Sequence, residues 1–148
     1  MKLIILGDIH GQWDAANASV HAALKEHPDA KAVVQLGDLG DGWPMKMGLV
    51  NRWPINFKLP VFVVDGNHEN FDALEAGDVN PKLTWMPRGH VMSFENIPMM
   101  FFGGATSPDI GNRIIGRSWW PQESITQAQV EKALDWRGFD TEGKRTQL

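Results

Sequence analysis

Short apolar runs, each followed at once by glycine or acidic turn residues, recur through the first half of the chain. They occupy residues 3–6, 32–36 and 61–64. Such runs are typical of strands buried on both faces of a parallel sheet. Apolar residues within residues 13–27 recur at the spacing of one helix face, which predicts an amphipathic helix. Buried strands that alternate with helical segments predict βαβ units and an α/β fold.

After Lys82 the pattern changes to strand-like runs separated by turn residues. The runs read LTWMP, HVMSFE and MMFFGG, with turn signals at residues 87–89 and 96–98. We interpret them as antiparallel ribbons rather than as further parallel strands. Earlier in the chain, a short helix is also predicted near residues 45–53.

The last third of the chain predicts one more helix and then a tail. Thr126 and Gln129 have the spacing of a capping box, in which each side chain bonds the backbone of the other. They predict a helix that runs to about Trp136 and buries Leu134. Residues 139–148 are polar and aperiodic, which is typical of a loose tail. A single domain over residues 1–148 is the simplest organisation.

The composition changes this picture mainly by exclusion. The chain is 43% hydrophobic and 22% charged, the balance of an ordinary globular protein. It has no cysteine, so a metal would need His, Asp, Glu or Asn ligands. The net charge of −4 argues against a broad basic face for nucleic acid. The apolar run after Lys2 is too short for a signal peptide or a membrane span. A cytoplasmic location without a membrane partner is therefore expected.

Polar side chains follow all three predicted parallel strands, in the stretches GDIHG, GDLGD and DGNHE. Because the carboxyl ends of parallel strands lie at one edge of a sheet, these side chains should converge in space. Carboxylates, imidazoles and amide oxygens suit Mn²⁺, Fe or Zn²⁺. Asp38 has the right place to bridge two ions about 3.5–4 Å apart, and His68 would protonate a leaving oxygen.

The three motifs, in this order and at these strand ends, resemble those of the calcineurin-like metallophosphoesterases. The resemblance implies a layered α/β/β/α sandwich with two divalent ions (Mn, Fe, Zn or similar). Asp8 and His10 would then bind the first ion, Asp38 would bridge both, and Asn67 would bind the second. His68 would face the scissile bond of a phosphomonoester or phosphodiester. A water or hydroxide shared by the ions would attack phosphorus in line.

The second motif departs from the family pattern at one position. Many members carry a phosphate-contacting arginine there; this chain has Asp41 followed by Gly42. Phosphate contact would have to come from elsewhere or be left to the metals. Arg113 and Arg117 are the candidate substrate-binding residues.

A larger departure concerns the histidines that normally complete both metal sites. The family usually continues into another strand that ends in a metal-binding histidine, and then into a Gly-His-x-His motif. This chain ends at Leu148 and has no histidine after His90. We therefore expect a domain truncated on its C-terminal side, with the second metal site incomplete. The alternative function is a degenerate member that is non-catalytic or needs a partner, either a complementing chain or a second copy.

Plainer interpretations stay open for several of these residues. Asp8 and His10 also fit a helix-capping turn after a strand. Glu69 is interpreted as a residue of a first helical turn rather than a ligand. Trp119 and Trp120 would cover the core or stack on a base, and nucleic acid is expected only as a substrate.

Overall fold

The computed structural model describes residues 1–40 and 53–134. Three sequence predictions fall wholly or almost wholly outside these residues. They concern the short helix near residues 45–53, the turn at Asp41 and Gly42, and the tail at residues 139–148.

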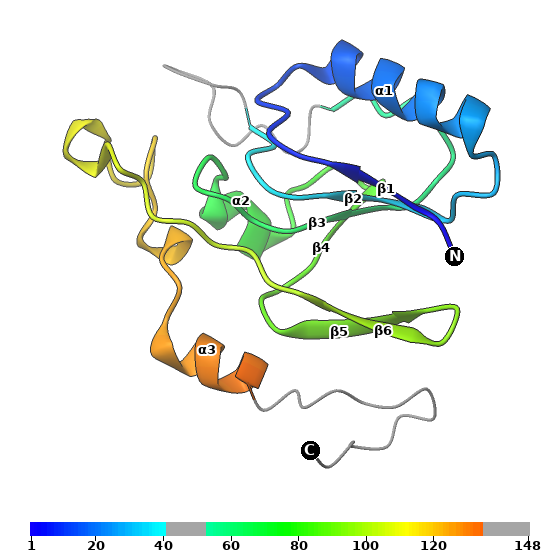
Figure 1. Ribbon diagram of the computed structural model, residues 1–148. Helices are drawn as coiled ribbons and strands as arrows, with labels where there is room; N and C mark the ends of the chain where they lie inside the picture. The colour runs from blue at the N-terminus through cyan, green and yellow to red at the C-terminus, as the bar shows by residue number, and fades with distance from the viewer. Residues whose placement is uncertain (41–52, 135–148) are drawn as a thin grey trace.

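A four-stranded parallel sheet forms the centre of the fold (Figure 1). Its strands lie side by side in chain order, β1 through β4. They are β1 (Leu3–Leu6), β2 (Ala32–Gln35), β3 (Val61–Val63) and β4 (Leu83–Trp85). The first three confirm the strands predicted from the sequence, and β2 is buried at every position. The predicted burial on both faces is wrong for β1, because this strand lies at the edge of the sheet and Ile5 is 51% exposed.

The fourth strand corrects the sequence interpretation. Leu83–Trp85 pairs in parallel with β3, with Leu83 opposite Val61, and is not part of an antiparallel ribbon. A helix between the two strands, α2 (Phe71–Ala76), supplies the crossover that a parallel partner requires. The sequence interpretation placed a first helical turn at Glu69, and the helix begins two residues later, at Phe71.

Helices cover one face of the sheet. The predicted amphipathic helix forms as α1 (Trp13–Glu26) and buries Ala16 and Val20. The Asn70 side chain accepts a hydrogen bond from Ala73 N at the start of α2. Phe71 and Leu74 of α2 join Val20 in a single apolar core with the strands.

A β-hairpin covers the opposite face. It consists of β5 (His90–Phe94) and β6 (Ile97–Phe101), paired antiparallel as the sequence predicted. Both residues of its turn, Glu95 and Asn96, have positive φ (48° and 68°), the backbone signature of a tight two-residue hairpin turn. A second apolar cluster, which includes Val34 of β2 and Phe101 of β6, fills the space between sheet and hairpin.

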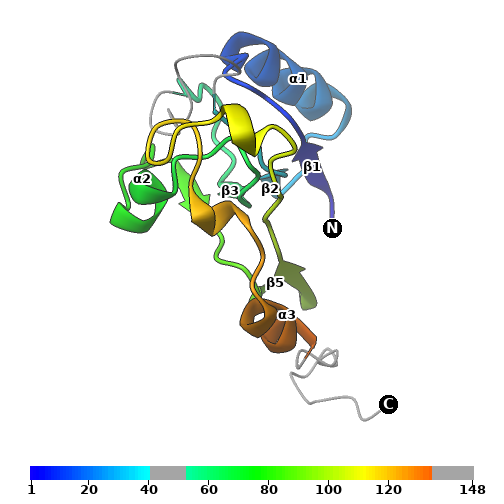
Figure 2. The same ribbon diagram turned by 90° about the vertical axis from the view of Figure 1, so that its left-hand side faces the viewer.

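The last described helix, α3 (Gln127–Leu134), lies beyond the hairpin, on the side away from α1 (Figures 1 and 2). Its capping box is confirmed, because Gln129 N donates to Thr126 Oγ1 and Thr126 N donates to Gln129 Oε1. The order of layers is thus helix, sheet, sheet, helix. This confirms the predicted α/β/β/α arrangement.

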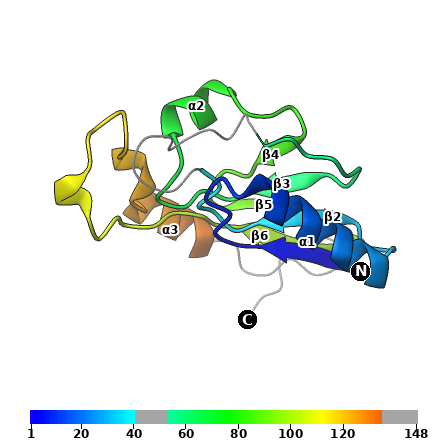
Figure 3. The same cartoon turned by 90° about the horizontal axis from the view of Figure 1, so that it is seen from above.

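One long connection leads from β6 to α3 and carries two short 3₁₀ turns, η1 (Ile110–Asn112) and η2 (Pro121–Glu123). It projects beyond the sheet on the side where β1, β2 and β3 end (Figures 1 and 3). The connection can therefore bring side chains to the loops that follow these strands.

Candidate metal centre

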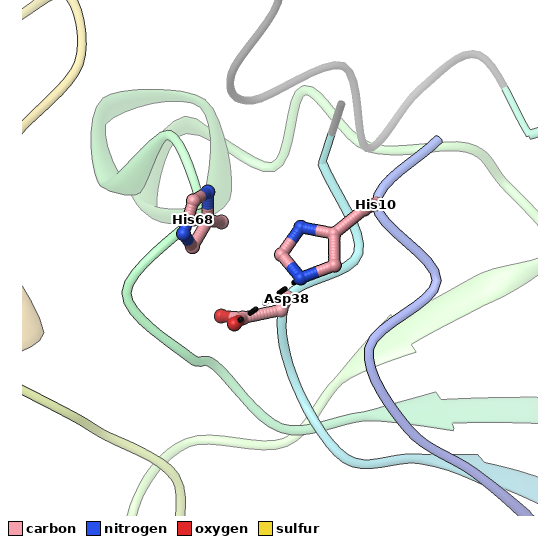
Figure 4. A group of neighbouring side chains, drawn as sticks. All are labelled: His10, Asp38 and His68. Carbon is pink, nitrogen blue, oxygen red and sulfur yellow. Dashed lines mark ion pairs between the residues drawn. The ribbon is translucent and has the colours of Figure 1, made fainter. Parts of the chain in front are cut away.

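Three loops at the carboxyl edge of the sheet bring His10, Asp38 and His68 together (Figure 4). One ligand-type atom from each residue lies within 4.8 Å of the other two. His10 Nε2 is 3.7 Å from Asp38 Oδ2. The two imidazole rings meet edge to face, with their centroids 4.7 Å apart. The convergence predicted from the strand ends is therefore present for these three residues.

The backbone of two of these loops is held in an uncommon conformation. Asp8, His10 and Asp38 have positive φ values of 45°, 45° and 52°, in the left-handed region that non-glycine residues rarely adopt. Such strain persists only where surrounding contacts impose it, and it concentrates at functional sites. Here His10 N donates to Asp38 O (2.9 Å), which links the first loop to the second.

The second and third loops are in direct contact through glycines. A Cβ added to Gly66 would overlap Asp38 Oδ1, and one added to Gly37 would lie 2.8 Å from Gly66 N. The same Asp38 oxygen accepts a hydrogen bond from Asn67 N (3.0 Å). Only residues without a side chain permit this approach, so the glycines set the position of the Asp38 carboxylate.

The buried Glu69 side chain connects these two loops through hydrogen bonds. The sequence interpretation did not predict this role. Glu69 lies before Asn70, the cap of α2, and is only 1% exposed. Its carboxylate accepts hydrogen bonds from Leu39 N (2.6 Å) and Gly66 N (2.5 Å). Burial raises the pKa of Glu69 to about 7, although both backbone donors favour the charged form. Its role is therefore structural support of the site rather than the first turn of a helix.

The remaining predicted ligands have different surroundings. Asn67 lies next to His68, and its Nδ2 donates to Ser107 Oγ (3.2 Å). Asp8 is exposed and, among the described residues, does not belong to the group formed by His10 and its neighbours. Ligation by Asp8 and Asn67 remains a prediction from the sequence motifs.

Arg113, predicted to contact substrate, reaches the site from the long connection. Its side chain is 4% exposed and donates from Nε to Asp109 Oδ1 (2.7 Å). From the other end, Nη1 donates to Asn67 O (2.8 Å), and Nη2 lies 3.4 Å from His68 Nε2. Arg113 thus contacts the loop that carries His68. Arg117, the second predicted arginine, is exposed in the same connection.

The electrostatic setting of His68 disfavours its protonated form. Burial lowers the pKa of His68 from its ordinary value of 6.5, and the Arg113 guanidinium and His10 lower it further. The Asp38 carboxylate acts in the opposite direction. A neutral imidazole is the form that binds a metal ion or takes up a proton.

Both imidazoles also have one ring nitrogen without a partner among the described residues, while the Nε2 atom of His10 faces Asp38 and that of His68 faces Arg113. His10 Nδ1 and His68 Nδ1 are buried and have no hydrogen-bond partner within the described part of the chain. A buried polar atom without a partner costs about 1–3 kcal/mol. Imidazoles beside a carboxylate are the ligands that suit Mn²⁺, Fe or Zn²⁺.

Comparison with known proteins agrees with this geometry. A family model described as calcineurin-like phosphoesterase matches residues 1–145 of the chain. A search of curated proteins finds no match. Over residues 1–40 and 53–134, no helix has the length and apolar character needed to cross a membrane. The cytoplasmic location stays a prediction.

Proposed function

The chain belongs to the calcineurin-like phosphoesterase family, and on that premise we propose that it hydrolyses phosphomonoesters or phosphodiesters with the help of divalent metal ions. The observation that carries the proposal is the convergence of His10, Asp38 and His68 from three separate loops. We assign metal binding to His10 and Asp38, together with Asp8 and Asn67 from the motifs. Manganese is the ion we propose first, with Fe and Zn as the other candidates.

A divalent ion held by these residues would supply Lewis acidity and an activated water for attack on phosphorus. Asp38 would be the ligand shared by the ions, as the motif implies, and its carboxylate is oriented by Asn67 N, which donates to Oδ1 while Oδ2 lies toward His10. His68 is assigned proton exchange with the ester oxygen, since its ring lies against His10 at the open edge of the sheet.

Arg113 is assigned to hold the phosphoryl group. Its guanidinium is buried at its base, fixed by Asp109, and directed toward His68. A planar guanidinium with fixed orientation is suited to phosphate oxygens, and Arg113 would supply the phosphate contact for which many family members have an arginine where this sequence has Gly42.

The test is turnover of p-nitrophenyl phosphate and bis-p-nitrophenyl phosphate with added Mn²⁺. Asp38→Asn and His68→Ala should each abolish most of the activity. Asp14→Asn and His90→Ala, which change exposed residues outside the site, should retain it. Equal rates in all five proteins would contradict the proposal.

Metal analysis of the purified chain separates this proposal from the alternative of a degenerate family member. Two ions per chain, lost together in Asp38→Asn, support the two-metal enzyme with Asp38 as a shared ligand. One ion per chain with no turnover supports a binding role or the need for a partner that completes the second site.

A further inference from the structure

A chain of hydrogen bonds leads from Asn67 into the interior, away from the metal centre. Asn67 Nδ2 donates to Ser107 Oγ (3.2 Å), and Ser107 Oγ donates to Glu123 Oε2 (2.8 Å). Ser107 N donates to the other carboxylate oxygen, Glu123 Oε1 (2.7 Å). Ser107 and Glu123 are 2% and 1% exposed. Both side chains are thus fully removed from solvent and fully used in this network.

The direction of each bond follows from what each group can donate. A carboxylate only accepts, so the single hydroxyl proton of Ser107 is committed to Glu123. Ser107 Oγ then offers only lone pairs to Asn67, and Asn67 must present its NH₂ group to it. The NH₂ group of the Asn67 amide therefore faces Ser107, and its carbonyl oxygen faces away from Ser107.

The far end of the network is itself held in place. The main-chain carbonyl of Glu123 accepts from Ala105 N (3.0 Å) and from Arg88 Nη2 (3.0 Å). Arg88 is 4% exposed at its side chain and also binds Asp65. Because these contacts fix Glu123, Ser107 and the Asn67 amide have little freedom to rearrange.

We propose that Ser107 and Glu123 are positioning residues that orient the Asn67 amide with its oxygen available to a divalent ion. The inference rests on the proposed function, which makes Asn67 a ligand. Residues that orient a ligand without touching the metal commonly change metal affinity about 10–100-fold when replaced. The bond polarity makes Glu123 as important to Asn67 as Ser107, although Glu123 is one residue further from the site.

Glu123→Gln gives the sharpest test. Its amide oxygen would still accept from Ser107 N, while its NH₂ group would donate to Ser107 Oγ. The Ser107 hydroxyl would then be free to donate to the Asn67 oxygen and turn the amide around. The bond from Ser107 N would keep its direction, and the other two hydrogen bonds would survive with their direction reversed, so thermal unfolding in EDTA should change little.

The measurement is Mn²⁺ affinity of the metal-free full chain, followed by the electron paramagnetic resonance signal of free Mn²⁺. Glu123→Gln and Ser107→Ala should each weaken binding by about 10–100-fold. Ser124→Ala should bind as the wild type does, because Arg88 bonds the backbone carbonyl of this neighbouring serine, which the substitution keeps.

Two outcomes would overturn the inference in distinguishable ways. If Asp38→Asn loses Mn²⁺ but Glu123→Gln and Ser107→Ala keep wild-type affinity, the metal site stands and the positioning role is wrong. If the wild-type chain itself binds no Mn²⁺, the proposed function fails and the inference fails with it.

Discussion

Replacement of Arg88 by leucine should destabilise the chain strongly, because it removes one half of a buried ion pair. Arg88 makes six hydrogen bonds: two to Asp65 Oδ2 (2.9 and 2.6 Å), and four to acceptors in the segment around η2 and α3. The two side chains are 4% and 0% exposed. Arg88→Leu would therefore leave a buried carboxylate whose remaining side-chain donor, within residues 1–40 and 53–134, is Trp85 Nε1 (3.2 Å).

The magnitude follows from this burial. Removal of one partner from a buried ion pair costs about 3–5 kcal/mol, because the other charge stays desolvated and unpaired. A domain of this kind has a total stability of about 5–15 kcal/mol, so the loss is a large share of it. Urea unfolding followed by tryptophan fluorescence measures the change, and the chain has seven tryptophans as reporters.

Two controls isolate the cause. Lys2→Ala removes a pair with Asp29 whose side chains are 50% and 59% exposed, and its unfolding midpoint should stay at the wild-type value. Asp65→Asn added to Arg88→Leu should recover part of the loss, because it removes the unpaired charge. An Arg88→Leu change below about 1 kcal/mol would refute the reasoning. A double variant no more stable than the single one would show that the unpaired charge is not the cause.

Three further predictions concern the site. The pKa of Glu69 is raised from 4.5 in the unfolded chain to about 7 in the folded chain. The contribution of the Glu69 proton to the free energy of unfolding is therefore complete below the pKa of the unfolded chain and is lost as the pH rises through about 7. Chemical unfolding of the metal-free chain between about pH 5 and about pH 8 should show the free energy of unfolding of the wild type falling relative to that of Glu69→Gln. The control Glu75→Gln, which changes an exposed residue, should follow the wild type. Parallel pH profiles for the wild type and Glu69→Gln would contradict this prediction. Gly66→Ala should lower the free energy of unfolding by about 1–3 kcal/mol and weaken Mn²⁺ binding, because the new Cβ would overlap Asp38 Oδ1. Gly111→Ala, which has open space around it, should do neither. Calorimetry measures the stability, and metal titration measures the binding. Arg113→Ala should raise KM for p-nitrophenyl phosphate more than it lowers kcat, since it would remove the proposed phosphate contact, and an unchanged KM would exclude that role.

The parts of the fold that the sequence predicted are those with a local signature. The buried strands and α1 follow from apolar periodicity, and the α3 cap follows from the spacing of Thr126 and Gln129. The convergence of His10, Asp38 and His68 was predictable for a different reason. Parallel topology alone places the ends of β1, β2 and β3 at one edge, whatever the intervening sequence.

The parts that the sequence did not predict depend on contacts between distant residues. Ser107 and Glu123 are 16 positions apart, and Asn67 and Ser107 are 40 apart, so no periodicity marks them. Glu69 was interpreted as a helix residue because it lies just before α2 in the sequence. Its hydrogen bonds from Leu39 N and Gly66 N become evident only in the folded structure, where its carboxylate is buried. Leu134 was expected to be buried by the helix pattern, yet it is 70% exposed. Helix periodicity identifies a face but not what covers it.

The supporting contacts explain how a strained site can be stable before an ion binds. Left-handed backbone at Asp8, His10 and Asp38 costs of order 1–2 kcal/mol per residue. Against this stand hydrogen bonds that exist only when the loops adopt that shape, each contributing about 1 kcal/mol net. They join His10 N and Gly11 N to the second loop, and Asn67 N, Leu39 N and Gly66 N to carboxylates. The total cost of the left-handed residues and the total stabilisation from these hydrogen bonds are of similar size, so the hydrogen bonds offset the backbone strain of the loops. The geometry of the candidate metal centre is therefore set by the protein's own contacts, and an ion that binds there would enter a group of side chains already brought together.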